Sequence, residues 1–496
     1  NFNWEKIDKF PSVPDTTYVN DIIASQHEAN TVYAIFNNHK RGDFKPYILK
    51  SADRGKTWVA IQGNLPARGS VYAIAEDPVN PMLLFAGTEF GLYFTVDGGK
   101  EWIPLKSGLP NIAVRDIEIQ KRENDLVIAS FGRGFYILDD YTPLRNFSDD
   151  LLKKSAHIFP IKDALMYVES QPLGLNGKSH QGESYYTAAN PPLGAVFTYL
   201  LNDTLRTIKE NRQLKEKELI KSGVDVNYPS FEMMREEDQE EKPYLLFSIT
   251  DDKGNEVRRT KTEPKAGINR ITWDFRYTST TQVSLTKEIA GRYEESPTGP
   301  LALPGKYYVS LSKSINGVLT QIAGPQEINC VALNLATLGA ADKTALLDFE
   351  QKVNELRRII ITASKTKSET DTKIKLIKEA VATIPGVPID LMKKVKETEA
   401  LLQNIELKLY GDRSLAGREY ETYPGIMERL ETVILSMWQA TSAPTNTNID
   451  GYNIVKEELD PLLVDLNSAL GKARDLDKDL DKYKAPYTPG RIPDIK

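Results

Sequence analysis

The chain is short of the residues that usually mark a disulfide-rich, metal-binding or membrane-spanning protein. Cys330 is its single cysteine, so a disulfide framework is excluded. The four histidines (His27, His39, His157 and His180) have no spacing typical of zinc ligands, and none is placed to pair with the cysteine. No apolar run approaches the roughly 18 residues of a membrane span. We therefore expect no metal site and no cofactor.

An excess of charge of one sign is also lacking. The 496 residues include 63 basic and 69 acidic side chains, which gives a formal net charge of −6. Because nucleic acids are bound through a basic surface, a nucleic acid is not expected as the main partner. The sequence also lacks a G-x-S-x-G segment and a P-loop, which mark many hydrolase nucleophiles and nucleotide sites.

Two eight-residue segments of the chain nearly repeat one another. The first reads S-x-D-x-G-x-T-W and the second T-x-D-x-G-x-E-W. Repeats spaced by about 40 to 50 residues, each with its own turn, are typical of β-propeller blades. In such a turn the aspartate accepts hydrogen bonds from its own backbone, glycine supplies conformational freedom, and tryptophan packs beneath the hairpin. These Asp-box residues are Ser51, Asp53, Gly55, Trp58, Thr95, Asp97, Gly99 and Trp102.

We interpret the Asp-box residues as structural. The motif places Asp53 and Asp97 on the outer hairpin of a blade, away from the central channel, which argues against catalytic carboxylates. The same position favours packing over sugar stacking for Trp58 and Trp102.

Residues 1–145 divide into about three such units, each with an inner strand, a strand of β-branched and aromatic residues, and a strand leading to the Asp turn. The box is degenerate at 139–143, as suits a last blade. Three blades cannot close a ring, because a propeller needs about four to eight. The chain begins in mid-repeat at Asn1, so we expect a fragment whose missing blades lie upstream or on another chain.

Strand patterns return after a connector at 146–184 that is rich in turn residues. Short strands over 185–338 predict a β-sandwich. A charged segment near 204–222 predicts a helical insertion within it, and residues 235–241 predict an acidic, solvated loop.

The period of apolar residues becomes helical over 341–483, which predicts four or five antiparallel helices. Breaks are expected at 385–388 and 442–444, and Pro461 is expected at the first position of the last helix. An extended tail, 484–496, follows. The predicted fold class is multidomain and mainly β, with a partial propeller, a sandwich and a C-terminal helical bundle.

Three residues are candidates for a site in the propeller channel. Asp21 and Asp116 hold equivalent places in the first and third inner strands, and inner strands line the channel. A channel carboxylate can act as an acid, base or ligand, although a structural hydrogen bond to a neighbouring blade is the alternative. Arg133 lies between Gly132 and Gly134, which would let the backbone approach an anion; a salt bridge or backbone clamp is the alternative.

The Asp boxes, together with segments 130–140, 190–196, 267–274 and 303–307, resemble the bacterial sortilin-like (VPS10-type) BNR/Asp-box propeller proteins, often labelled glycosyl hydrolases by analogy. The resemblance implies a large N-terminal propeller, an immunoglobulin-like sandwich, a helical C-terminal region and an extracytoplasmic location in a bacterium: periplasmic, outer-surface or secreted. It implies no established activity, because fold-level analogy does not transfer function.

Two functions follow as hypotheses. The first is a non-enzymatic binding or scaffold protein that recognises polypeptides or other envelope components. The second is a glycan-cleaving hydrolase whose main catalytic residues lie in blades upstream. The absence of a recognisable catalytic set favours the first.

Overall fold

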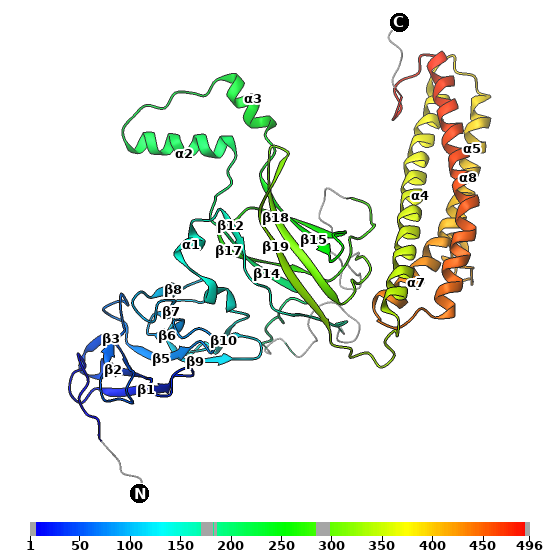
Figure 1. Ribbon diagram of the computed structural model, residues 1–496. Coiled ribbons are helices and arrows are strands. Elements are labelled where there is room, and N and C mark those ends of the chain that lie inside the picture. The colour runs from blue at the N-terminus through cyan, green and yellow to red at the C-terminus, as the bar shows by residue number, and fades with distance from the viewer. Residues whose placement is uncertain (1–5, 170–181, 183–185, 284–297, 492–496) are drawn as a thin grey trace. The chain divides into compact units, whose positions relative to one another are not determined.

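The computed structural model describes residues 6–169, 182, 186–283 and 298–491 (Figure 1). The protein mixes helix and sheet, with several small sheets up to Ala332 and helices from Lys343 onward. It divides into two compact units, each built from several segments. The first unit comprises Asn1–Pro160, Thr198–Val226 and Pro264–Arg270, and the second comprises Ile161–Phe197, Asn227–Glu263 and Ile271–Lys496.

Three antiparallel sheets follow one another at the N-terminal end of the first unit, and each is a meander of strands in chain order. The first sheet contains β1 (Tyr18–Ala24), β2 (Val32–Asn38), β3 (Asp43–Ser51) and β4 (Val59–Ala60). The second contains β5 (Val71–Glu76), β6 (Leu84–Thr88), β7 (Gly91–Thr95) and β8 (Ile103–Leu105). The third contains β9 (Val114–Gln120), β10 (Asp125–Ser130) and β11 (Phe135–Leu138). Short 3₁₀ helices lie at His39–Arg41 and Thr142–Asn146.

Burial shows how these sheets stack. Every residue of β5 and β6 is buried, on both faces of the second sheet. The first sheet covers one face through residues such as Tyr33 and Ile35, and the third covers the other through residues such as Ile117. Gly87 of β6 permits the second contact, because a Cβ atom there would lie only 2.7 Å from Val114 Cγ1.

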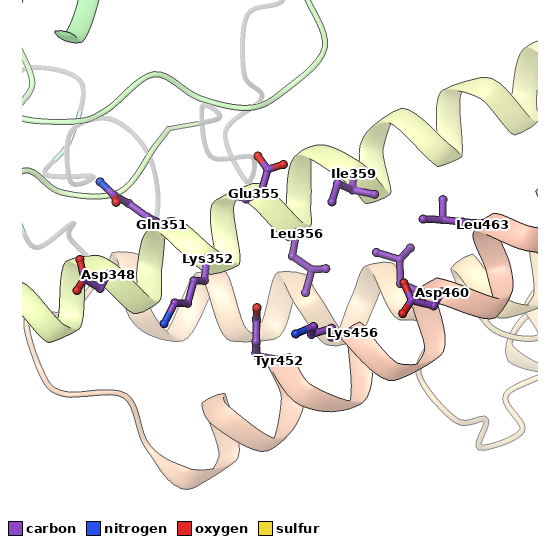
Figure 2. A pocket seen from close by; sticks show the side chains of 11 residues that line it. Asp348, Gln351, Lys352, Glu355, Leu356, Ile359, Tyr452, Lys456, Asp460 and Leu463 are labelled. Carbon is purple, nitrogen blue, oxygen red and sulfur yellow. The ribbon is translucent and has the colours of Figure 1, made fainter. Parts of the chain in front are cut away.

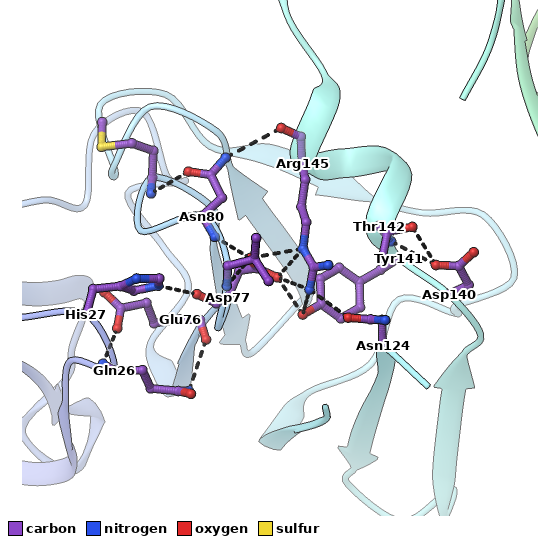
Figure 3. Close-up of polar contacts among 12 residues, drawn as sticks. Gln26, His27, Glu76, Asp77, Asn80, Asn124, Asp140, Tyr141, Thr142 and Arg145 are labelled. Carbon is purple, nitrogen blue, oxygen red and sulfur yellow. Dashed lines mark hydrogen bonds and ion pairs between the residues drawn. The ribbon is translucent and has the colours of Figure 1, made fainter. Parts of the chain in front are cut away.

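A buried polar network ties the three sheets together (Figure 3). Asp77, directly after β5, accepts hydrogen bonds from the Tyr141 hydroxyl at 2.6 Å and from Arg145 Nε at 2.8 Å, and both partners follow β11. From the β1–β2 turn, the His27 ring donates to the Asp77 carbonyl oxygen at 2.8 Å. Glu76 accepts further bonds from the same turn. The network thus joins elements of all three sheets through β5.

The chain continues through α1 (Asp149–Leu152) into two further sheets. One has the order β12-β14-β17 and the other β13-β19-β18-β15-β16. Their strands are β12 (Ala156–Ile158), β13 (Ala164–Met166), β14 (Ala195–Leu201), β15 (Tyr244–Asp251), β16 (Glu256–Thr262), β17 (Gly267–Trp273), β18 (Gly305–Ile315) and β19 (Val318–Ala332). Parts of the predicted connector, at 170–181 and 183–184, lie outside the described residues, as do residues 185 and 284–297 of the predicted sandwich.

Aromatic side chains join these two sheets. Trp273 on β17 lies 5.0 Å from Tyr307 on β18, between ring centroids, and Phe197 on β14 stacks on Phe247 of β15 at 6.4 Å. The long β18–β19 hairpin turns at Asn316 and Gly317, and both residues have positive φ, as a two-residue hairpin loop requires.

Two helices lie between β14 and β15. The helix predicted near 204–222 is α2 (Ile208–Lys221), which begins at a capping box formed by Thr207 and Glu210. The prediction of an acidic loop at 235–241 is wrong for most of its length, because α3 (Phe231–Gln239) covers it. Ser230 accepts a hydrogen bond from the backbone of Met233, so a local cap starts this helix in a segment whose charges suggested a loop.

The C-terminal helices pack around one apolar core. The core is formed by α4 (Lys343–Thr383), α5 (Leu391–Tyr410), α7 (Ile426–Trp438) and α8 (Asn446–Lys482), whereas the short α6 (Arg413–Ala416) contributes no buried residue. Both expected breaks fall between helices. The expectation that Pro461 starts the last helix is wrong: α8 begins 15 positions earlier, at a capping box of Thr445 and Asn448, and runs through the proline. Residues 492–496 of the expected tail lie outside the described residues.

We predict that Asp77→Asn destabilises the first unit by about 3 kcal/mol, because it leaves the buried Arg145 guanidinium without its carboxylate. Burial alone would raise the pKa of Asp77, but the bonds from Arg145 and Tyr141 outweigh burial and lower this pKa below 3.8. The stabilisation is therefore present above about pH 4 and is lost as the pH falls through the depressed pKa. Urea unfolding between pH 3 and 7 measures the difference. Asp150→Asn, which removes an exposed pair with Lys153, should have little effect.

We predict the opposite pH dependence for Glu350 of α4, which is 3% exposed. Burial raises the pKa of Glu350 from 4.5 to about 7, and the positive charge of Arg276 offsets only part of that rise. Ionisation of this carboxyl therefore costs the folded state about 3 kcal/mol once the pH exceeds 7. Glu350→Gln should stabilise the protein at pH 8 and make little difference below pH 4.5, as measured by denaturant unfolding. Equal effects at both pH values would contradict this assignment.

Candidate functional site

The innermost strands of the three N-terminal sheets, β1, β5 and β9, share one irregularity. In each, the pairing with the next strand shifts by one residue at the same place: between Val19 and Asp21, between Val71 and Ala73, and beside Arg115. A β-bulge of this kind redirects a side chain out of the regular alternation, and bulges are common beside functional sites. The bulged residues are Asn20, Tyr72 and Arg115, and we call them the bulge row.

The three bulge-row side chains come from three different sheets, yet they contact one another in sequence. The Asn20 amide donates a hydrogen bond to the Tyr72 carbonyl oxygen. The Arg115 guanidinium carbon lies 3.8 Å above the Tyr72 ring and 5.0 Å from the ring of Phe131. The Tyr72 hydroxyl donates to the carboxylate of Glu89, in the β6–β7 turn. The row is therefore a continuous line of contacts along one edge of the stacked sheets, with Tyr72 buried, Asn20 half-buried and Arg115 exposed.

Asp21 and Asp116 come directly after the bulged residues of their strands. Burial raises the pKa of Asp21, bonds from the backbone of Ile22 and Ile74 oppose that rise, and the negative charge of Asp116 adds to it. The two aspartates are therefore near enough to repel each other. Asp116 accepts a hydrogen bond from the backbone of Ile117 at 2.9 Å. The structure brings together these two channel candidates from the first and third sheets.

Arg133, the third candidate, lies in the β10–β11 turn. The flanking Gly132 and Gly134 both have positive φ, so the turn itself requires them. The Arg133 side chain is exposed, and within the described residues it forms neither a hydrogen bond nor an ion pair. It follows Phe131, whose ring lies near Arg115.

Sequence reasoning missed Asn20, Tyr72 and Arg115, although a signal was present. In the alignment of the three inner strands these residues hold the same column, immediately before Asp21, Ala73 and Asp116. That column contains an amide, a phenol and a guanidinium. The β-bulge in each strand redirects these three side chains toward one edge of the sheets, and the sequence does not indicate the bulges.

The Asp-box residues lie elsewhere, on the outer hairpins β3–β4 and β7–β8. Asp53 accepts bonds from Ser51, from the backbone of Thr57 and from the Thr57 hydroxyl, which lower the pKa of Asp53 to about 2. Trp58 Nε1 donates to the Gly55 carbonyl oxygen at 2.9 Å. These contacts all lie within the turn, so they fix its shape.

The second box has the same arrangement. Thr95 donates to Asp97 at 2.6 Å, and the backbone N–H groups of Lys100 and Glu101 donate to the same carboxylate. Partial burial alone would raise the pKa of Asp97, yet these bonds lower it. Trp102 Nε1 donates to the Ile61 carbonyl oxygen, between the first and second sheets.

A groove of about 540 Å³ lies between α4 and α8 (Figure 2). Its floor is apolar, with Leu356 and Leu459 buried, and charged side chains of both signs surround it. The lining residues are Asp348, Gln351, Lys352, Glu355, Leu356, Ile359, Tyr452, Lys456, Leu459, Asp460 and Leu463. The mixed charge gives the groove no preference for an anion or a cation.

Two further features limit the chemistry of the described residues. In the part of the chain that the structure describes, no group of three or more His, Cys, Asp or Glu side chains is arranged to hold a metal ion. Burial raises the pKa of the Cys330 thiol to about 12, so this thiol is protonated at neutral pH and is a poor nucleophile. In the same part of the chain, no helix is both long and apolar enough to cross a bilayer.

We predict different effects on the stability of the protein when the Asp-box residue Asp97 and the channel candidate Asp21 are replaced. Asp97→Ala should destabilise the protein by about 1–2 kcal/mol, because three donors lose their acceptor. Asp21→Asn should leave stability unchanged or raise it at pH 7, because the raised pKa means that the folded state disfavours the charged carboxylate. Denaturant unfolding of both variants at pH 7 measures these changes. A large loss of stability in Asp21→Asn would show that its carboxylate is structural.

Comparison with known proteins adds distant similarities. No protein-family model matches the chain, and no curated protein matches its sequence. An ancestral GH74 enzyme matches 23% of this chain at 27% identity and a TM-score of 0.20, over 14% of its own length. YCF48 bound to D1 peptide matches 26% at 19% identity and a TM-score of 0.20, over 37% of its length.

An extracellular domain of a one component system from B. thetaiotaomicron matches 64% of this chain at 11% identity and a TM-score of 0.19, over 31% of its length. The chain thus spans well under half of each of these proteins. All three are distant propeller-type proteins, and at these TM-scores the similarities carry no functional argument.

Proposed function

We propose that this chain is the C-terminal part of a larger extracytoplasmic bacterial protein that binds polypeptide or envelope components without cleaving them. In this proposal the three N-terminal sheets are blades of a sortilin-like Asp-box propeller, and the two following sheets form an immunoglobulin-like sandwich. The helices serve as a spacer or docking element. The bulge row is the observation that carries the proposal, since three consecutive sheets contribute one residue each to a single row, in which the buried Tyr72 supports the exposed Arg115.

Exposed apolar side chains on the first and third sheets support the proposal that the propeller has further blades. On β11, Phe135 is 76% exposed and Ile137 is 60% exposed, and on β1, Tyr18 and Ile22 are 67% and 61% exposed. The second sheet, in contrast, is covered on both faces. Exposed apolar side chains on the two terminal sheets are what a stack of blades leaves when its ring is incomplete. Further blades, from this protein or from another chain, would cover them.

Binding is favoured over catalysis by the chemistry of the bulge row. Arg115 stacks on Tyr72 and Phe131, and arginine and aromatic side chains are enriched where proteins recognise one another. Among the described residues, Glu89 is the carboxylate bonded to the row, and the Tyr72 hydroxyl holds it.

Glycoside hydrolysis is the second candidate, and one observation favours it. Burial and the negative charge of Asp116 raise the pKa of Asp21, and glycosidases act through two neighbouring carboxyl groups.

The test incubates the protein together with the upstream blades that the proposal requires with a panel of polysaccharides and measures new reducing ends, while an array of immobilised peptides measures binding. We expect peptide binding and no release of sugar. The alternative predicts release that falls about a hundredfold in Asp21→Asn and Asp116→Asn, the scale of a lost acid or base. Asp150→Asn, on exposed α1, serves as the matched control. Sugar release with that pattern would overturn the proposal.

A further inference from the structure

The bulge row continues into a longer edge formed by the adjoining turns. Glu89, bonded to Tyr72, precedes Phe90, and the Phe90 ring lies 3.6 Å from where a Cβ atom of Gly69 would be. Gly69 follows Arg68, and its N–H donates to the Phe44 carbonyl oxygen at 2.8 Å. At the other end, Phe131 leads through Gly132 to Arg133. We define the bulge edge as Arg68, Tyr72, Phe90, Arg115, Phe131 and Arg133.

The three arginines of this edge have no carboxylate partner. Arg68, Arg115 and Arg133 are exposed, and within the described residues none of them forms an ion pair or a hydrogen bond. Two aromatic neighbours hold Arg115 in place: its guanidinium carbon lies 3.8 Å from the Tyr72 ring centroid and 5.0 Å from that of Phe131. A guanidinium presented in this way is ready to bind a carboxylate through two parallel hydrogen bonds.

Exposed aromatic rings alternate with these cations. Phe90 is 54% exposed and Phe131 is 67% exposed, and both lie in short turns where no local contact requires a large apolar side chain. Phe44, whose backbone is bonded to Gly69, is 43% exposed. Apolar rings between spaced cations suit a ligand that carries both acidic and apolar groups along its length.

We infer that the bulge edge binds an extended acidic polypeptide segment, with its carboxylates on Arg68, Arg115 and Arg133 and its apolar side chains on Phe90 and Phe131. This inference rests on the proposed binding function and names the chemistry of its partner. A single small anion would engage one guanidinium, whereas Arg68 before β5, Arg115 on β9 and Arg133 in the β10–β11 turn together suit a chain of repeated carboxylates. Both a peptide and a polyuronate carry repeated carboxylates. Because arginine and aromatic side chains are enriched where proteins recognise one another, the bulge edge favours the peptide.

Asp21 and Asp116 set a limit on this ligand. Apart from Glu89, which is bonded to Tyr72, they are the acidic groups that directly follow the bulged residues of β1 and β9, and within the described residues neither forms an ion pair with Arg115. An acidic segment close to them is repelled, so removing either charge should strengthen binding. We therefore expect that removing an arginine of the bulge edge weakens binding, whereas removing the charge of Asp21 or Asp116 strengthens it.

The test measures fluorescence anisotropy of a labelled peptide that alternates Glu and Tyr, titrated with the full chain at low and moderate salt. Arg115→Gln should raise the Kd about tenfold, which corresponds to the loss of one charged hydrogen-bonded pair. Arg68→Gln and Arg133→Gln should raise it several-fold, Asp116→Asn should lower it, and added salt should weaken binding. Arg122→Gln is the matched control, because Arg122 is exposed in the β9–β10 turn and pairs only with Glu123.

Thermal unfolding accompanies each variant. If Arg115→Gln fails to fold, the exposed Arg68 and Arg133 variants still decide the question, since within the described residues their side chains form no hydrogen bond or ion pair. A peptide with Gln in place of Glu that binds equally well would overturn the inference but leave the proposed binding function intact. Tighter binding of a polygalacturonate oligomer, or an equal effect of Arg122→Gln, would also overturn it. Release of sugar by the chain would overturn the proposed function itself.

Discussion

Burial of the second sheet between its two neighbours is the constraint on which the N-terminal part of this protein depends. All residues of β5 and β6 are removed from water, and this requires the first and third sheets to approach closely on both sides. Gly87 permits the approach to Val114, and the Asp77 network satisfies polar groups that the approach buries. Packing and hydrogen bonding therefore select the same arrangement of sheets.

The bulge row is a consequence of this stacking. A bulge in a single isolated sheet would turn one side chain aside, but three stacked sheets with bulges in the same place align three side chains. Asn20, Tyr72 and Arg115 contact one another because β1, β5 and β9 lie side by side. The scaffold contributes rigidity, and the identity of one residue per sheet sets the chemistry. Repeated units can thereby build a composite surface from positions that differ in sequence.

Carboxylates in the same sheets have contrasting roles. Asp53, Asp77 and Asp97 each accept several hydrogen bonds, and their pKa values are lowered, so their charge supports the fold. Asp21 has a raised pKa because burial and a neighbouring negative charge oppose ionisation. Residues whose charge is unfavourable to the fold are candidates for function, since stability alone does not explain their presence.

The sequence by itself determined the local features: the Asp-box turns, the order of the strands, and the apolar stripes such as Val353 and Ile360 of α4. These follow from short-range hydrogen bonding and periodicity. The prediction from sequence placed the start of the last helix at Pro461, whereas α8 begins at Asn446. A proline can be tolerated inside a long helix that is held by tertiary packing. Only the tertiary structure decided which side chains meet. The bulges, the Asp77 network and the meeting of Tyr72 with Arg115 depend on contacts between residues far apart in sequence, and no local pattern encodes them.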